Sequence, residues 1–228
     1  MVITGTSRGI GKYLANYYCE KGFTVIGCSK KPLEYQTNEN YHHFCLDIYD
    51  EKKVKELFSF IRKTFGRLDI LINNAGIASM NHSLLTPLST VEKILNTNIA
   101  GTFLFSRESA KLMKKFSFGR IINFSTIAVP IKLEGEAIYA SSKSAVNTLS
   151  QILAREYSSY GITVNVIAPT LVETDLIKKV SDVKKEKILQ KITIPKYTQM
   201  DDITNVIDFF IKLESNLITG QIIYLGGP

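Results

Sequence analysis

A chain of 228 residues, 45% hydrophobic and 21% charged, is large enough for one α/β domain with a substantial core. It has no apolar run of about 18 residues and starts without a basic region or signal-peptide core, which predicts no membrane span and a cytoplasmic location. The net charge of +7 comes without a recognised nucleic-acid motif, so we expect solvated basic faces and no nucleic-acid partner. A basic rim around a pocket for an anionic substrate stays open as the alternative.

Short apolar runs alternate with longer segments of helical periodicity along the whole chain. Strands are expected at Val2–Thr4, Thr24–Gly27, His43–Leu46, Ile70–Asn73, Arg120–Ser125, Thr163–Ala168 and Ile222–Leu225. Helices are expected at Ile10–Lys21, Lys52–Phe65, Thr90–Phe116, Ile138–Tyr157 and Asp201–Leu213. This alternation predicts a single domain, residues 1–228, of the α/β class: a Rossmann-type, doubly wound sheet of seven parallel strands with helices on both faces.

The first predicted strand leads directly into a glycine-rich turn. Gly5, Gly9 and Gly11 allow a tight turn, close backbone approach to a pyrophosphate and close packing of helix on strand, with the helix N-terminus facing the anion. Because a strand precedes the turn and an amphipathic segment follows it, we interpret it as a dinucleotide-binding loop and not as an ordinary glycine-rich loop. The strand itself is short, so a few residues before Met1 are expected to be missing.

The residues after the second predicted strand indicate which dinucleotide is bound. NAD-specific sites place a carboxylate about 20 positions beyond the glycines, where it binds the ribose 2′-hydroxyl. Here the segment reads Gly27-Cys28-Ser29-Lys30-Lys31, without an acidic residue. Lys30, assisted by Arg8, can neutralise a 2′-phosphate, so we expect NADP(H) to be preferred over NAD(H).

Neither the cysteines nor the histidines have the spacing of a metal site. The cysteines lie in apolar stretches and are typical of small core residues in a reducing compartment: Cys19, Cys28 and Cys45. The histidines have no carboxylate or cysteine at ligand spacing: His42, His43 and His82. We therefore expect no metal.

Tyr139 and Lys143 are four residues apart in a predicted helix and so project from one face. A cation about 4 Å from a phenol, at an effective dielectric near 20, is worth roughly 4 kcal/mol, or about three pKa units. We expect Lys143 to lower the pKa of Tyr139 enough for proton transfer to or from a carbonyl or alcohol oxygen. The alternative for this common pattern is a half-buried tyrosine beside a solvated lysine.

Taken in order, these motifs resemble those of the classical short-chain dehydrogenase/reductase family over essentially the whole chain. The segments that carry the resemblance are Thr4–Gly11, Asn73–Gly76, Asn98, Thr126 and Tyr139 with Lys143. The chain is most similar to the 3-oxoacyl-[acyl-carrier-protein] reductase-like members, through the segments Gly119–Asn123 and Gly161–Asn165. That branch contains enzymes for many substrates.

The resemblance implies a set of cofactor contacts. They are Gly5, Ser7, Arg8, Gly9, Ile10 and Gly11 in the loop, Lys30, Asp47 and Ile48 near the adenosine, Asn74, Ala75 and Gly76 near its ribose, and Tyr139, Lys143, Pro169, Val172 and Thr174 near the nicotinamide. Asn73 braces the sheet in the family. Where the family usually has Pro-Gly this chain has Pro169-Thr170, which removes backbone freedom and leaves the carboxamide contacts open.

The resemblance also implies four catalytic residues. Tyr139 is the general acid for reduction, Lys143 lowers its pKa and holds the nicotinamide ribose, and Asn98 holds a water that links Lys143 to solvent. Thr126 stands where the family has serine and supplies the same hydroxyl, with a methyl group that narrows the pocket. Ser125 is the second choice, because it should point the other way from a strand end.

A polar, lysine-rich segment, residues 171–196, falls where the family has a mobile substrate lid; an exposed helix with solvated lysines is the alternative. The expected activity is NADPH-dependent reduction of a small-molecule or carrier-bound ketone, best a 3-oxoacyl thioester, although Tyr160 stands where carrier-binding relatives often have arginine. Basic residues that could compensate are Lys111, Lys114 and Lys115. Alternatives are a ketone of nucleotide-sugar or surface-carbohydrate metabolism and, in another class, a dinucleotide-binding sensor with little turnover. The family resemblance implies a homotetramer, with a dimer second.

Overall fold

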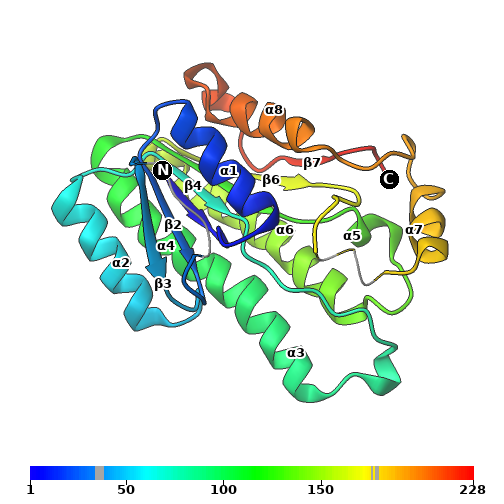
Figure 1. Ribbon diagram of the computed structural model, residues 1–228. Coiled ribbons are helices and arrows are strands. Elements are labelled where there is room, and N and C mark those ends of the chain that lie inside the picture. The colour runs from blue at the N-terminus through cyan, green and yellow to red at the C-terminus, as the bar shows by residue number, and fades with distance from the viewer. Residues whose placement is uncertain (34–38, 176, 178–179) are drawn as a thin grey trace.

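The computed structural model describes residues 1–33, 39–175, 177 and 180–228 of the chain. In this described part, seven strands form one parallel sheet in the order β3-β2-β1-β4-β5-β6-β7 (Figure 1). The strands are β1 (Val2–Thr4), β2 (Val25–Ser29), β3 (Tyr41–Cys45), β4 (Ile70–Asn73), β5 (Gly119–Phe124), β6 (Ile162–Ala168) and β7 (Ile222–Tyr224). The predicted doubly wound fold is confirmed.

The helices are α1 (Gly9–Glu20), α2 (Glu51–Thr64), α3 (Leu88–Leu95), α4 (Thr102–Met113), α5 (Ala128–Ile131), α6 (Ala137–Tyr157), α7 (Asp182–Leu189) and α8 (Met200–Ile211). Apart from α5 and α7, which were not among the predicted helices, the helices lie close to their predicted positions. Single turns of 3-10 helix lie at Ser83–Leu85, Lys114–Phe116, Ser158–Tyr160 and Leu213–Leu217. The helix predicted at Thr90–Phe116 is interrupted by a π-helical turn, Asn96–Gly101, that joins α3 to α4.

Two hydrophobic cores cover the two faces of the sheet. On one face α1 and α8 pack against the strands, with Leu14 and Ile207 among the fully buried side chains. On the other face α2, α4 and α6 do the same, through residues such as Leu57 and Phe105. Figure 1 shows these two layers with the sheet between them. Because both faces are covered, the inner strands are buried along their whole length.

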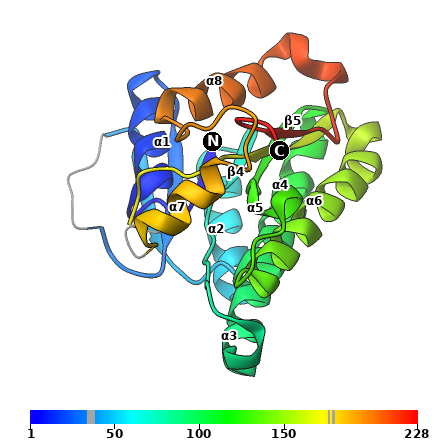
Figure 2. The same ribbon diagram turned by 90° about the vertical axis from the view of Figure 1, so that its right-hand side faces the viewer.

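From β1 the chain adds β2 and β3 on one side of the sheet, and then β4 and all later strands on the other side, so the direction in which strands are added changes between β1 and β4. In a doubly wound sheet the connections from such a pair run to opposite faces, which opens a crevice at the carboxyl ends of the strands. The glycine loop follows β1 and the segment Asn74–Gly76 follows β4, so both motifs lie at this crevice. Figure 2 shows α5 and α7 at the same end of the molecule, while α3 projects away from it.

Cys45 is exposed, so its assignment to the core was wrong; it is the last residue of the edge strand β3, where no further element covers it, whereas Cys19 and Cys28 are buried. Within the described residues, none of the helices combines the length and apolarity that a bilayer crossing requires.

Candidate functional site

The glycine loop is shaped by close approaches that only glycine permits. Gly5 has φ +76° and Gly9, the first residue of α1, has φ +56°. A Cβ atom on Gly11 would lie 2.2 Å from the carbonyl oxygen of Gly5, so helix and strand are in direct backbone contact here. Asn74 Nδ2 donates to the Thr4 carbonyl oxygen at 2.9 Å and so ties the loop to the end of β4. The N-terminus of α1 therefore faces a preformed cradle suited to an anion.

The lysine that directly follows β2 already forms an ion pair. Lys30 Nζ lies 2.5 Å from Asp47 Oδ2 in a half-exposed ion pair and also lies over the ring of Tyr49. The other oxygen of Asp47, Oδ1, is buried and has no hydrogen-bond partner among the described residues. Ile48 was expected to contact a cofactor, but its side chain is buried in the core against Gly101, which leaves only its backbone for that role.

Asn98 is held rigidly inside the π-helical turn. Its Oδ1 accepts from the backbone N–H of Ile77 at 2.9 Å, and its Nδ2 donates to the Ile77 carbonyl oxygen at 3.0 Å and to Ser142 Oγ at 2.9 Å. A Cβ on Gly76 would lie 3.4 Å from Asn98 Oδ1 and 3.2 Å from Lys143 Nζ, so glycine leaves room for these two groups to converge. Single π turns inside helices often occur at functional sites.

Tyr139 and Thr126 meet in the crevice. Thr126 follows β5, Tyr139 lies in the first turn of α6, and the Thr126 hydroxyl lies close enough to the phenol to affect its pKa. Ser125 Oγ instead donates to the Lys143 carbonyl oxygen, so the two neighbouring hydroxyls point to different partners, as expected. The structure therefore brings Asn98, Thr126, Tyr139 and Lys143 to one place.

One electrostatic prediction was wrong. Desolvation, and after it the charge of Glu136, raises the pKa of Tyr139 to about 12, while the nearby hydroxyl of Thr126 lowers it by less. Lys143 Nζ donates to the Phe124 carbonyl oxygen at 2.8 Å, and burial lowers its own pKa to about 8. Lys143 is not among the groups that shift the pKa of Tyr139, so desolvation of the phenol decides the direction of the shift. Tyr139 is protonated at neutral pH, which is the form that can donate a proton to a carbonyl oxygen.

The comparisons with known proteins agree with this geometry. The short chain dehydrogenase family matches residues 1–185. The chain belongs to the short-chain dehydrogenases. It is 32% identical to the 3-oxoacyl-[acyl-carrier-protein] reductase FabG of Escherichia coli K12, over 99% of this chain and 95% of the relative. FabG of Staphylococcus aureus Mu50 is also 32% identical, with 99% and 96% covered.

Solved structures give the same result. The structure "ElxO with NADP Bound" superimposes with a TM-score of 0.89 at 32% identity, covering 98% of this chain and 95% of that one. A tyrosine-to-phenylalanine variant of ElxO with NADPH bound gives a TM-score of 0.88 at 31% identity, with the same coverage. This short-chain dehydrogenase is therefore an NAD(P)-dependent oxidoreductase that acts on carbonyl and hydroxyl groups.

Thr170, which replaces the usual glycine, anchors a distant segment of the dehydrogenase. Its backbone N–H donates to Thr198 Oγ1 at 3.0 Å, and its Oγ1 accepts from the Thr198 backbone N–H at 2.9 Å and lies 2.7 Å from Thr198 Oγ1. The side chain thus pins residues 196–198 to the end of β6. Nearby, Thr174 lies against Gly9 of the glycine loop, whereas the expected contact Val172 is 7% exposed and packs mainly into the core.

The lysine-rich segment contains α7 and packs against the residue that follows Thr126. Ile188 and Ile192 form a small buried cluster with Ile127, the residue after Thr126. Lys185 pairs with Asp182 at 2.8 Å on the outer side. Two further lysines of the predicted lid, Lys178 and Lys179, lie outside the described residues.

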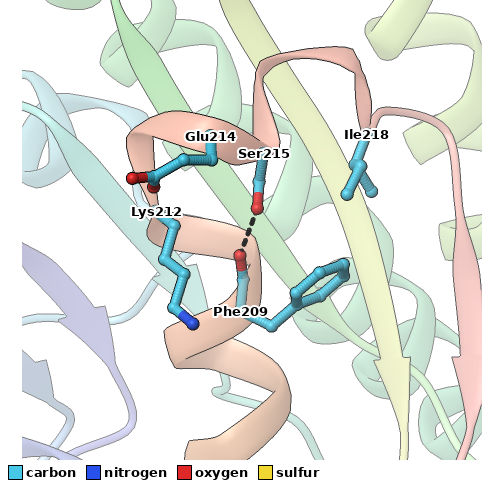
Figure 3. A pocket seen from close by; sticks show the side chains of 5 residues that line it. All are labelled: Phe209, Lys212, Glu214, Ser215 and Ile218. Carbon is cyan, nitrogen blue, oxygen red and sulfur yellow. Dashed lines mark hydrogen bonds between the residues drawn. The ribbon is translucent and has the colours of Figure 1, made fainter.

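A hollow beside α8 is separate from the predicted site residues. It has a volume of about 540 Å³ and lies where α8 ends, and none of the predicted site residues lines it (Figure 3). Its lining residues are Phe209, Lys212, Glu214, Ser215 and Ile218. Among the described residues, no three histidine, cysteine or acidic side chains gather in a way that could hold a metal ion.

Glu136 is an acidic residue beside Tyr139 that the sequence analysis did not identify as part of the site. It caps the start of α6, is 7% exposed, and its Oε2 has no hydrogen-bond partner among the described residues. Burial raises its pKa from 4.5 to about 7. Its spacing of three residues before Tyr139 is the one sequence signal that could have identified it.

This raised pKa predicts a pH-dependent stability. Between pH 4.5 and 7 the folded protein binds a proton at Glu136 that the unfolded chain releases, so this contribution to stability is lost as pH rises through about 7. We therefore compare the free energy of unfolding of Glu136→Gln with that of wild type at each pH. The difference, variant minus wild type, should be more positive at pH 8 than at pH 5, by up to about 3 kcal/mol. Urea unfolding of both proteins at both pH values measures this difference. An equal effect of the substitution at the two pH values would contradict the assignment.

Proposed function

We propose that this short-chain dehydrogenase reduces a ketone to a secondary alcohol with NADPH. The observation that carries the proposal is the convergence of the Thr126 and Tyr139 hydroxyls beside Lys143 and Asn98 in the crevice that the glycine loop borders. Thr126 polarises the carbonyl, and the protonated Tyr139 gives its proton to the carbonyl oxygen as the carbonyl carbon is reduced. The solved relatives with NADP or NADPH bound support this reading.

The described residues fit a dinucleotide. The loop at Gly5, Gly9 and Gly11 offers backbone N–H groups and a helix N-terminus for the pyrophosphate. The buried, unpaired Oδ1 of Asp47 is an acceptor that fits an adenine amino group. When bound, NADPH supplies the hydride. Lys143 is expected to hold the ribose next to the nicotinamide, and Asn98 a water on the path that returns a proton to Tyr139.

Lys30 is proposed to select NADPH over NADH by exchanging its ion pair with Asp47 for the 2′-phosphate. Lys30→Ala should lower the affinity for NADP about tenfold and leave the affinity for NAD unchanged. Isothermal titration of both nucleotides measures this. Lys55→Ala, which removes one positive charge on α2, is the control. If wild type binds both nucleotides equally and Lys30→Ala alters neither affinity, the 2′-phosphate assignment is wrong.

A 3-oxoacyl thioester is the proposed substrate, because the FabG relatives are named for that reaction. Of the three lysines proposed to favour an acidic carrier, Lys111 is paired with Glu108 at 2.7 Å and Lys114 lies over the ring of Tyr160. A panel assay that follows NADPH absorbance, with a 3-oxoacyl thioester, a simple ketone and a keto-sugar nucleotide, tests the substrate. Preference for the keto-sugar nucleotide would instead support the alternative substrate class, a ketone of nucleotide-sugar or surface-carbohydrate metabolism. NADPH binding without turnover of any ketone would support a sensor.

We also propose that residues 171–196 form a substrate lid on a single domain and that four copies assemble. The packing of Ile188 on Ile127, next to Thr126, supports the lid. The exposed apolar side chains Phe103 on α4 and Ile152 on α6, 39% and 48% exposed, support an interface along these two helices. Light scattering after size exclusion distinguishes a tetramer from a dimer. A monomer would contradict this assembly.

A further inference from the structure

A continuous chain of hydrogen-bonded side chains runs beneath the adenosine end of the crevice. Thr6 Oγ1 lies 2.6 Å from the Tyr41 hydroxyl, which lies 2.9 Å from Nδ1 of His43. The other ring nitrogen of His43, Nε2, lies 3.1 Å from Ser29 Oγ, and Ser29 Oγ lies 2.7 Å from the Lys31 carbonyl oxygen. Thr6, Tyr41 and Ser29 are each at least nine-tenths buried.

The direction of these bonds fixes the protonation of the ring. A carbonyl oxygen only accepts, so Ser29 must donate its proton to Lys31 and accept from His43. His43 therefore carries a proton on Nε2. Burial lowers the pKa of His43, which favours the neutral ring, so Nδ1 accepts from the Tyr41 hydroxyl. Thr6 then donates to Tyr41 at 2.6 Å in preference to the Cys28 carbonyl oxygen, which is 3.4 Å away.

The two ends of this chain lie on the two loops that border the proposed nucleotide site. Thr6 directly follows Gly5 in the glycine loop, and Lys31 directly follows Lys30. Gly27 makes room for the network, because a Cβ there would lie 2.0 Å from the Tyr41 hydroxyl and 2.6 Å from Thr6 Oγ1. A glycine inside a strand marks such a close approach. The network therefore has space that any side chain at residue 27 would fill.

We propose that His43 is a positioning residue for the 2′-phosphate of NADPH. Through Ser29 it holds the turn Ser29–Lys31, and with it the backbone of Lys30. Through Tyr41 it ties this turn to the glycine loop. A shift of the turn moves Lys30 relative to the 2′-phosphate but does not affect a nucleotide that has a hydroxyl there. This inference rests on the proposed use of NADPH.

The test is the ratio of NADP to NAD affinity. His43→Leu should lower that ratio about tenfold, because a buried hydroxyl of Ser29 loses its donor and the turn shifts. His43→Gln keeps an N–H donor near the position of Nε2 and should restore most of the ratio. His42→Leu is the matched control: this ring lies on the opposite face of the same strand, 5.5 Å from the ring of Phe65, and its loss should leave the ratio unchanged. A ratio unaltered in His43→Leu overturns the proposal.

Two further readouts separate the possible failures. If wild type shows no preference for NADP, the proposed cofactor and this inference both fail; if wild type prefers NADP and His43→Leu keeps that preference, only the inference fails. Should His43→Leu not fold, nitrogen-15 NMR of the wild-type ring still decides. A neutral ring protonated on Nε2 is the expected result, and a ring protonated on Nδ1 overturns the proposed chain.

Discussion

Replacing Tyr139 with phenylalanine is expected to lower kcat for ketone reduction by about 10³-fold while NADP affinity stays unchanged. The phenol is the proton donor of the proposed reaction, and its pKa of about 12 keeps the proton available at neutral pH. Phenylalanine fills nearly the same volume, so the crevice and the start of α6 should persist. Steady-state assays that follow NADPH absorbance, with titration of NADP into each protein, measure the two quantities separately.

The control for this change is Tyr157→Phe, at the opposite end of the same helix. It removes a hydroxyl from α6 without touching the crevice and should retain the wild-type rate. Thr126→Val should fall between the two, because it removes the hydroxyl beside the phenol of Tyr139 but leaves the proton donor in place. Comparable turnover in wild type and Tyr139→Phe would remove Tyr139 from the mechanism.

Gly11→Ala should destabilise the protein by about 3 kcal/mol and abolish dinucleotide binding. The added Cβ would lie 2.2 Å from the Gly5 carbonyl oxygen and 2.5 Å from Asn74 Nδ2. Neither neighbour can retreat easily, because the first is backbone and the second is hydrogen-bonded to Thr4. Relief requires α1 to move away from β1, which opens the anion cradle. Urea unfolding and NADP titration measure the two effects.

Gly22→Asn provides the comparison for this glycine. Gly22 has φ +83° at the end of α1, with nothing within 4 Å of an added Cβ. Asparagine tolerates the left-handed conformation, so the cost should stay below about 1 kcal/mol and NADP binding should not change. Equal losses of stability and of NADP binding in Gly11→Ala and Gly22→Asn would show that the close contact at Gly11 does not determine the conformation of the loop.

Some of the site was predictable because its signals are local. The glycine spacing around Gly9 determines a tight turn from backbone sterics alone, and the four-residue spacing of Tyr139 and Lys143 determines that both side chains lie on one helix face. The alternation of apolar runs and helical periods is likewise a local property. It was enough to predict the doubly wound sheet.

Other parts of the site were not predictable, because they depend on groups far apart in the sequence. The reciprocal bonds of Thr170 with Thr198 join residues on either side of the lysine-rich segment. The Lys30 to Asp47 ion pair and the contact of His43 with Ser29 join neighbouring strands. No periodicity indicates which polar side chains will meet across such distances.

The sequence by itself determined the order of strands and helices, the conformation of the glycine loop and the helix face shared by Tyr139 and Lys143, because each follows from short-range sterics and hydrophobic periodicity. Only the tertiary structure decided the charge states. The raised pKa of the partly buried phenol of Tyr139, the orientation of Lys143 toward the Phe124 carbonyl and the raised pKa of Glu136 all depend on how completely packed elements exclude water. Desolvation is a property of the folded surroundings, and it reversed the pKa shift that the spacing of the two residues had predicted.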